Sequence, residues 1–173
     1  MKWSWPWRRE APASVKFSQL GWDVHSHLVP GVDDGAPDVD AALEMVRHMV
    51  SLGYRGMVLT PHIMSDLYPN SPSTLRGPYD NLVRAMKEAG IPMELRLAAE
   101  YLMDADMLRT LKEGDPMTFS CDDGQRAHEV MLMEFGFHHA PEEALVKDAL
   151  FEAQTRGITP LLAHCERYPY LHK

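Results

Sequence analysis

Short β-rich runs alternate with longer stretches of helical period from residue 20 onward, and this alternation constrains the fold most strongly. Five short β-rich runs predict strands at residues 21–25, 56–60, 93–98, 129–134 and 158–163. Helical periodicity predicts helices at residues 39–52, 79–89, 104–111 and 141–155, with a polar, turn-rich excursion at 113–127. Asp38 and Gly53 are the expected caps of the first helix. Strands that alternate with helices predict an α/β fold with a parallel sheet and right-handed crossovers.

The first 19 residues differ in composition from the rest of the chain. Three alternating tryptophans precede two arginines there. We interpret residues 1–19 as a flexible tail, with peripheral contact to a membrane surface or a partner as the alternative. Residues 20–173 are expected to form one domain. A complete (β/α) barrel usually needs about 250 residues, which is more than the 173 present.

The charge argues against nucleic acid as a partner, and the apolar patterning argues against a transmembrane helix. The net charge is -8 with a pI near 5.5, and an acidic surface does not attract nucleic acid. The sequence contains no uninterrupted apolar stretch of the roughly 18 residues that a transmembrane helix requires. The two cysteines are far apart in sequence, which is typical of a reducing compartment, so a cytoplasmic location is expected.

The cysteines do not match a thiol-dependent phosphatase. Such enzymes place five residues between the cysteine and an arginine, whereas four residues separate Cys121 from Arg126. Asp122 and Asp123 would raise the pKa of that thiol rather than lower it. Cys165 precedes Arg167 by only two positions. We therefore predict that neither cysteine is catalytic.

Imidazoles and carboxylates follow the predicted strands, each at the point where a strand ends. Because the carboxyl ends of parallel strands meet at one edge of a sheet, these side chains are expected to converge. An ionised glutamate beside an apolar core is costly unless a cation or another partner compensates its charge. A mixture of histidines and carboxylates suits Zn, Mn or Fe better than Ca or Mg alone. The sequence predicts a metal centre that contains His25, His27, His62, Glu100, Glu134 and His164.

The spacing of His25 and His27 strengthens this prediction, because residues two apart on a strand face the same side. A carboxylate such as Glu100 can also bridge two ions about 3.5–4 Å apart. The remaining histidines fall outside the pattern. We interpret His48, His128 and His172 as surface residues, and a place at the mouth of the site is open for His138 and His139.

The segment 23–35, Asp-Val-His-Ser-His-Leu-Val-Pro-Gly-Val-Asp-Asp-Gly, resembles the opening motif of the polymerase and histidinol phosphatase (PHP) superfamily. More narrowly, it resembles the bacterial protein-tyrosine phosphatases of capsule and exopolysaccharide gene clusters. Four later segments agree with this resemblance: 60–62, 99–101, 133–135 and 163–168. The resemblance implies a distorted (β/α)7, TIM-like barrel that binds three divalent ions, most often Mn, with Fe, Zn or Mg as alternatives.

The resemblance also implies roles for individual residues. His25, His27 and Glu100 would hold the first ion, and Glu100, Glu134 and His164 the second. Asp34 and His62 would hold the third ion, with the adjacent Asp33 as an alternative to Asp34. Arg167 matches the arginine that grips the substrate phosphate, a catalytic and substrate-binding role that guanidinium geometry suits. Glu166 is expected to support a ligand rather than to bind an ion.

The implied reaction is hydrolysis of a phosphotyrosine monoester by metal-activated water. The implied substrate is a bacterial tyrosine kinase that regulates capsular or exopolysaccharide synthesis. Alternatives are another PHP phosphoesterase, such as one that resembles histidinol phosphatase, or a metal-binding module without catalysis. The family pattern continues with two more strands and a further Asp-x-His, whereas this chain ends at Lys173. We therefore expect the domain to be incomplete at its C-terminus, lacking the last strands of the barrel.

Overall fold

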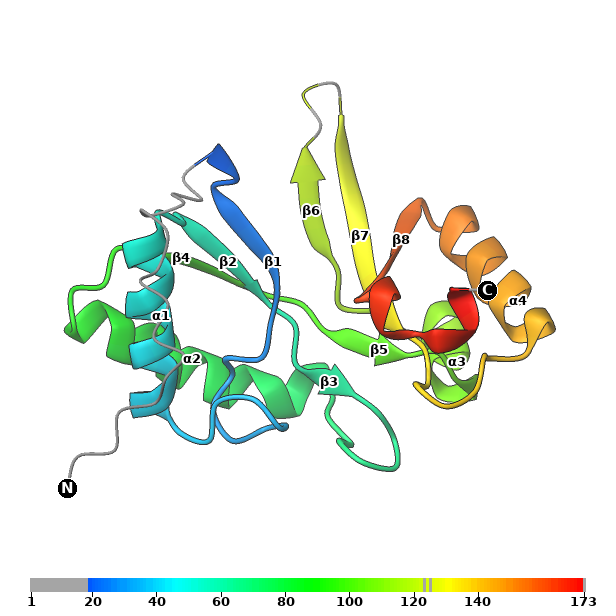
Figure 1. Ribbon diagram of the computed structural model, residues 1–173, viewed down its shortest axis with the longest axis horizontal. Coiled ribbons are helices and arrows are strands. Elements are labelled where there is room, and N and C mark those ends of the chain that lie inside the picture. Colours follow the sequence, from blue (N-terminus) through cyan, green and yellow to red (C-terminus); the bar gives the residue numbers. More distant parts are fainter. Residues whose placement is uncertain (1–18, 123, 125, 173) are drawn as a thin grey trace, which may run out of the picture.

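The computed structural model describes residues 19–122, 124 and 126–172. Its strands form two sheets (Figure 1). The first sheet has the order β1-β2-β4 and contains β1 (Trp22–Ser26), β2 (Gly56–Leu59) and β4 (Glu94–Leu97), all parallel. The second has the order β3-β5-β7-β6, with β8 on β7, and contains β3 (His62–Ile63), β5 (Glu100–Leu102), β6 (Phe119–Asp122), β7 (Ala127–Glu134) and β8 (Ile158–Leu162). The α/β class and the parallel pairing are therefore confirmed.

The two sheets are continuous through the chain, because β2 leads directly into β3 and β4 leads directly into β5. Backbone hydrogen bonds cross the junction, from Ala98 N to Leu59 O at 2.8 Å and from Glu100 N to Pro61 O at 3.0 Å. The parallel strands diverge into two halves on either side of this junction (Figure 1). In the described part of the chain the strands form no closed barrel.

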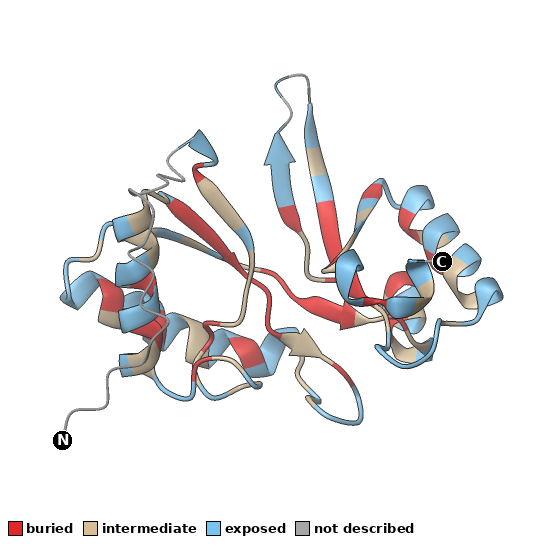
Figure 2. Ribbon diagram, in the orientation of Figure 1, coloured by how far each residue is buried: buried red, intermediate tan, exposed pale blue. Residues whose placement is uncertain are grey.

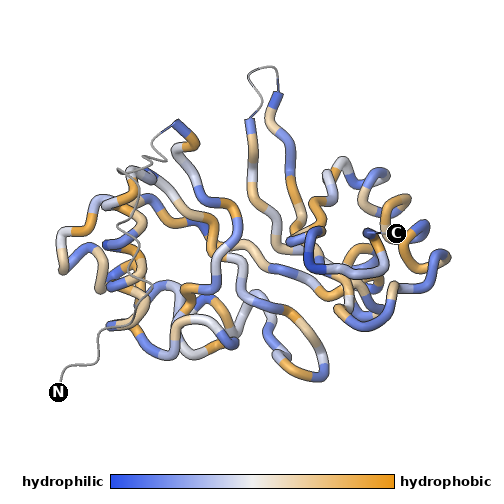
Figure 3. Tube along the Cα trace, viewed as in Figure 1, coloured by the Kyte–Doolittle hydropathy of each residue, from blue (hydrophilic) through white to orange (hydrophobic). Residues whose placement is uncertain are grey.

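In the described residues, four α-helices pack against the sheets: α1 (Val39–Leu52), α2 (Pro72–Glu88), α3 (Ala105–Glu113) and α4 (Glu143–Thr155). One apolar core lies between α1, α2 and β2, and a second lies between α3, α4 and β7. Buried residues concentrate along β2, β5 and the second half of β7 (Figure 2), and the hydrophobic colour follows β2 and β7 (Figure 3). None of the helices in the described residues combines the length and the apolar character needed to cross a bilayer.

The caps predicted for α1 are confirmed. The Asp38 side chain accepts a hydrogen bond from Ala41 N at 2.9 Å, and Gly53 ends the helix in the left-handed region at φ 98°. The predicted start of α2 at residue 79 is wrong, because this helix begins at Pro72. Ser71 and Thr74 form a capping box there, and the helix continues through Pro78.

The predicted excursion at 113–127 is also wrong in part, because it contains β6, which pairs antiparallel with β7. Phe119 is the buried residue of this strand. Phe119 joins Val58, Ala98 and Val130 in a third apolar cluster, on the opposite face of β2 from Met57 and Leu59. The predicted tail at 1–19 lies outside the described residues except for its last residue.

Candidate metal centre

The predicted side chains lie together at one edge of the sheets, as expected, but not all of them follow the end of a strand. His25 lies in β1, Glu134 ends β7, and His164 follows β8. His62 and Glu100 do not merely follow strands, because they open β3 and β5 and stand opposite each other in the ladder. The junction between the two sheets therefore runs through the site.

Glu100 lies at the centre of the site, and its side chain is fully buried. Its Oε2 atom is 3.1 Å from His25 Nε2, 3.2 Å from His27 Nε2 and 3.3 Å from His62 Nδ1. Its Oε1 atom is 2.9 Å from His164 Nε2. Four imidazoles thus surround one carboxylate, an arrangement that a shared cation stabilises.

Glu134 forms a second acidic position next to Glu100 and is only 1% exposed. Its Oε1 atom lies 2.9 Å from His62 Nδ1, and its Oε2 atom lies 3.7 Å from His164 Nε2. Oxygens of both glutamates and ring nitrogens of His62 and His164 lack an ordinary hydrogen-bond partner despite their burial. Unsatisfied buried polar atoms in such a cluster are what a bound ion would satisfy.

The adjacent side chains of Asp33 and Asp34 differ in their exposure to solvent. Asp33 faces the interior, where its Oδ2 atom lies 2.8 Å from His27 Nδ1 and accepts a hydrogen bond from His62 N at 3.1 Å. The Asp34 side chain is 66% exposed, and its Oδ1 atom is 3.5 Å from His62 Nε2. Asp34 is therefore placed to bind an ion, whereas Asp33 is placed to orient the His27 ring.

The electrostatics of the site favour cations. Burial raises the pKa of Glu100, but the adjacent imidazoles of His25 and His27 outweigh burial and hold the pKa well below its usual range. Burial lowers the pKa of His27, but the interactions with Asp33 and Glu100 outweigh burial and raise the pKa to about 10. Burial likewise raises the pKa of Asp33, and the bond with His27 reverses that effect and lowers it. Glu100 and Asp33 are thus ionised, and their negative charge stabilises a proton on the His27 imidazole.

Two backbone features hold the ligands in place. His164 has φ 29°, and it is the one residue other than glycine with a positive φ in the described part of the chain. This backbone turn directs its ring into the site between β8 and the short helix η2 (Cys165–Arg167). Gly35 packs against His27, where an added Cβ would lie 2.0 Å from the His27 carbonyl oxygen. Any larger residue at position 35 would displace the His27 backbone.

Among the described residues, three groups could each hold an ion, because the ligand atoms within a group lie within 4.8 Å of one another. These groups are His25, Glu100 and His164; His27, Asp34 and His62; and His62, Glu100 and Glu134. The structure thus brings together all seven predicted ligands. His25 Nε2, His27 Nε2 and Glu100 Oε2 lie within 3.2 Å of one another, which matches the first group that the resemblance implies. The structure also places His27 with Asp34 and His62, and His164 with His25. Glu100 and His62 each belong to two groups, which suits a cluster of ions with shared ligands.

The seven residues and Arg167 line a common cavity of 430 Å³, together with Met64, Leu67, Tyr68 and Phe137. Arg167 is exposed, and its Cζ atom lies 4.4 Å from the centre of the Phe137 ring. Glu166, His138 and His139 are exposed and are not among the lining residues. Neither cysteine lines the cavity, and both are exposed free thiols.

Sequence reasoning missed the aromatic residues around the cavity. The Tyr68 ring stacks on His62, with 5.3 Å between ring centres and 10° between planes. Tyr168 is fully buried and its hydroxyl oxygen accepts a hydrogen bond from Phe135 N at 3.0 Å. Phe137 follows the Met133-Glu134-Phe135 segment by two residues, and this proximity to a predicted ligand could have indicated its place at the cavity.

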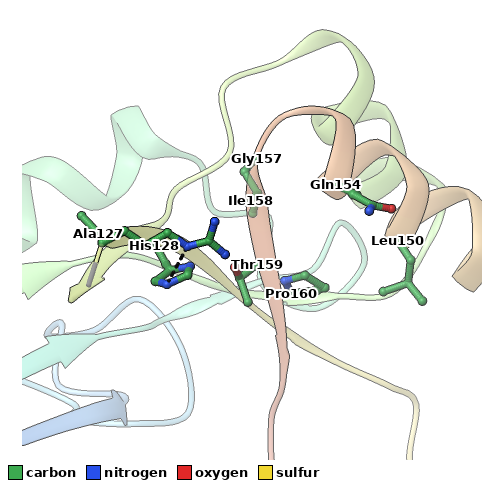
Figure 4. Close-up of a pocket in the computed structure, with 9 residues that line it drawn as sticks. Ala127, His128, Leu150, Gln154, Gly157, Ile158, Thr159 and Pro160 are labelled. Atoms are coloured by element: carbon green, nitrogen blue, oxygen red, sulfur yellow. Dashed lines mark hydrogen bonds between the residues drawn. The ribbon is translucent and has the colours of Figure 1, made fainter. Parts of the chain in front are cut away.

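A second cavity, of 580 Å³, lies at the opposite ends of β7 and β8 (Figure 4). Its lining includes Arg126, whose Nε donates to His128 Nε2 at 3.3 Å, and Gln154, Thr159 and Pro160. This lining contains none of the glutamates or aspartates of the chain. Arg126 is exposed, but His128 is partly buried, so the prediction that His128 is a surface residue holds only in part.

The family profile described as capsular polysaccharide synthesis, CpsB/CapC, matches residues 21–173. The chain is 30% identical over 151 residues to the tyrosine-protein phosphatase YwqE of Bacillus subtilis, covering 84% of this chain and 54% of YwqE. It is 26% identical over 149 residues to the tyrosine-protein phosphatase CpsB of Streptococcus pneumoniae, covering 86% and 58% of the two chains.

Among solved structures, the fold resembles that reported for YwqE from Bacillus subtilis and CpsB from Streptococcus pneumoniae, described as unique metal-dependent tyrosine phosphatases. The TM-score is 0.73 at 29% identity, and the match covers 87% of this chain and 58% of the other. The chain thus spans little more than half the length of the relatives it matches. The profile match extends over nearly the whole chain, so this chain belongs to the CpsB/CapC family of capsular polysaccharide synthesis.

Proposed function

We propose that the protein containing this chain is a metal-dependent protein-tyrosine phosphatase. The buried Glu100 carboxylate, with four imidazoles within 3.3 Å, is the observation that carries this proposal. The names of YwqE and CpsB as tyrosine-protein phosphatases support it. The capsule-synthesis family further supports a phosphotyrosine protein as substrate, namely a bacterial tyrosine kinase that regulates capsular or exopolysaccharide production.

We propose that the site binds three divalent ions, with Mn as the first choice among metals that suit mixed histidine and carboxylate ligands. Such ions would supply Lewis-acid activation of water and neutralise charge on the phosphoryl oxygens. The proposed ligands are His25, His27, Asp34, His62, Glu100, Glu134 and His164.

Other side chains of the site would bind the phosphate and orient the ligands. Arg167 is exposed at the cavity and presents a fork of N–H donors, so it would bind and orient the phosphate oxygens. Asp33 would hold His27 through Nδ1 and leave Nε2 directed at the site. No cysteine lines the cavity, so we assign phosphoryl transfer to water, without a covalent thiol intermediate.

We also propose that the domain of residues 20–173 forms part of a distorted (β/α)7 barrel. In the described residues, β1 pairs with β2 alone and β8 pairs with β7 alone, so each has one edge without a strand. The free edges of β1 and β8 are edges that further strands could join.

The decisive experiment uses the full-length protein and a phosphotyrosine peptide. EDTA should abolish phosphate release, and Mn should restore it. Glu100→Gln should lower turnover by at least about 100-fold, because metal affinity and bridging charge are both lost. Glu113→Gln, at an exposed position at the end of α3, is the matched control and should leave turnover unchanged. Activity that survives both EDTA and Glu100→Gln would refute the metal mechanism.

A further inference from the structure

Hydrophobic side chains stand at the mouth of the metal cavity, on both sides of its polar floor. Leu67 and Tyr68 lie on one side, and Phe137 lies in the loop that follows β7. Leu67 is 72% exposed and Phe137 is 37% exposed. We call these three residues, of which Tyr68 and Phe137 are aromatic and Leu67 is aliphatic, the aromatic collar. Exposed apolar groups at the rim of a charged pocket suit a ligand with one charged and one apolar end.

The first side of the collar is held firmly in place. Met64 and Tyr68 pair through two backbone hydrogen bonds, of 3.0 and 2.9 Å, which close the loop that carries Leu67. Asn70 Nδ2 lies 2.9 Å from both the His62 and the Val32 carbonyl oxygens and donates to them. Tyr68 therefore keeps its position over the His62 ring, and Leu67 stays at the rim.

The second side of the collar adjoins the proposed phosphate-binding arginine. The Phe137 ring centre lies 5.5 Å from that of His164 and 5.8 Å from that of Tyr168. The Arg167 guanidinium covers the Phe137 ring at 4.4 Å. A phosphate bound by Arg167 would thus place its ester group beside Phe137.

We propose that the aromatic collar receives the ring of an aryl phosphate and selects aryl over alkyl phosphate monoesters. This inference rests on the proposed phosphatase function and names the specificity-determining residues of that site. With the phosphate on the polar floor, the ester oxygen and its substituent point to the mouth, between Leu67 and Phe137. A flat ring there buries apolar surface and contacts an aromatic face, whereas a short alkyl chain offers less of both.

The test compares phenyl phosphate with ethyl phosphate in the Mn-loaded full-length protein. Leu67→Ala and Phe137→Ala should each lower kcat/KM for phenyl phosphate roughly five- to tenfold and leave that for ethyl phosphate within about twofold. Phe151→Ala is the matched control, because Phe151 is 64% exposed on α4 and does not line the cavity. It should change neither value.

A binding measurement separates this inference from the proposed function. Calorimetry with phenylphosphonate and methylphosphonate should show that the wild-type protein prefers the phenyl compound and that both collar variants reduce this preference. Equal losses for the aryl and alkyl compounds in both variants would overturn the collar, because they would indicate a disturbed Arg167. A wild-type protein without turnover would overturn the phosphatase proposal, and the phosphonate preference alone would then decide the collar.

Discussion

Asp33 Oδ2 lies 2.8 Å from His27 Nδ1, and the Asp33 side chain is shielded from solvent. This contact directs His27 Nε2 toward Glu100, 3.2 Å away. We predict that Asp33→Asn weakens Mn binding about 10- to 100-fold, because the variant loses the charge that orients the ring. Calorimetric titration of chelator-stripped protein measures the change. Asp40→Asn, exposed in the first turn of α1, is the control, and unchanged affinity in Asp33→Asn would contradict the prediction.

Gly35 leaves no room for a side chain. A Cβ there would lie 2.0 Å from the His27 carbonyl oxygen and 2.5 Å from the His27 Cβ. Gly35→Ala should therefore lower the free energy of unfolding by about 1–3 kcal/mol and weaken Mn binding. Gly136→Ala is the matched control, because its added Cβ would make an ordinary contact of 3.5 Å with His139 O. Urea unfolding of both variants gives the comparison, and equal stabilities would show that the His27 loop yields freely.

The buried Tyr168 connects the metal site to the second core. Its hydroxyl oxygen accepts the Phe135 N–H, and burial raises the pKa of Tyr168 to about 12, so the phenol stays neutral. Tyr168→Phe should lower the free energy of unfolding by about 1–3 kcal/mol, because the Phe135 N–H is left without this partner. Tyr170→Phe removes an exposed hydrogen bond to Gly136 O and should change the free energy of unfolding by less than about 0.5 kcal/mol. Similar losses in both variants would contradict this account.

The thiols are predicted to be dispensable. Cys121 lies on β6, and Cys165 is exposed at the start of η2. Cys121→Ser and Cys165→Ser should each retain wild-type turnover of a phosphotyrosine peptide, and iodoacetamide should not inhibit the wild-type protein. A large loss in either variant would favour a thiol pathway.

The local features of the fold were predictable because they depend on neighbouring residues. Asp38 and Gly53 fix the ends of α1 through bonds within one turn. The five predicted strands lie within two residues of their predicted bounds, because each is a short β-rich run with a clear limit. The start of α2 was missed because Pro72 and Pro78 suggest a break. In the structure Pro72 occupies the first turn, where a missing N–H costs nothing.

Features that depend on distant partners were not predictable in the same way. β6 is a polar segment whose position comes from pairing with β7 and from bonds of Thr118 and Ser120 to Glu129. Six of the seven proposed ligands were found from the strand ends, because parallel strands share an edge, whereas Asp34 came from the family resemblance alone. The contrast between Asp33 and Asp34 depends on side-chain directions that strand position alone does not determine.

The junction of the two sheets has a consequence for the lifetime of the protein. His25 and His27 come from the half built on α1 and α2, whereas Glu134 and His164 come from the half built on α3 and α4. A cation bound by ligands from both halves would link the two halves. It would add about 2.7 kcal/mol to the free energy of unfolding when the free ion concentration is a hundred times its dissociation constant. Metal starvation would then expose the chain to proteases as well as silence it, so that ion supply would set how much of the protein a cell retains.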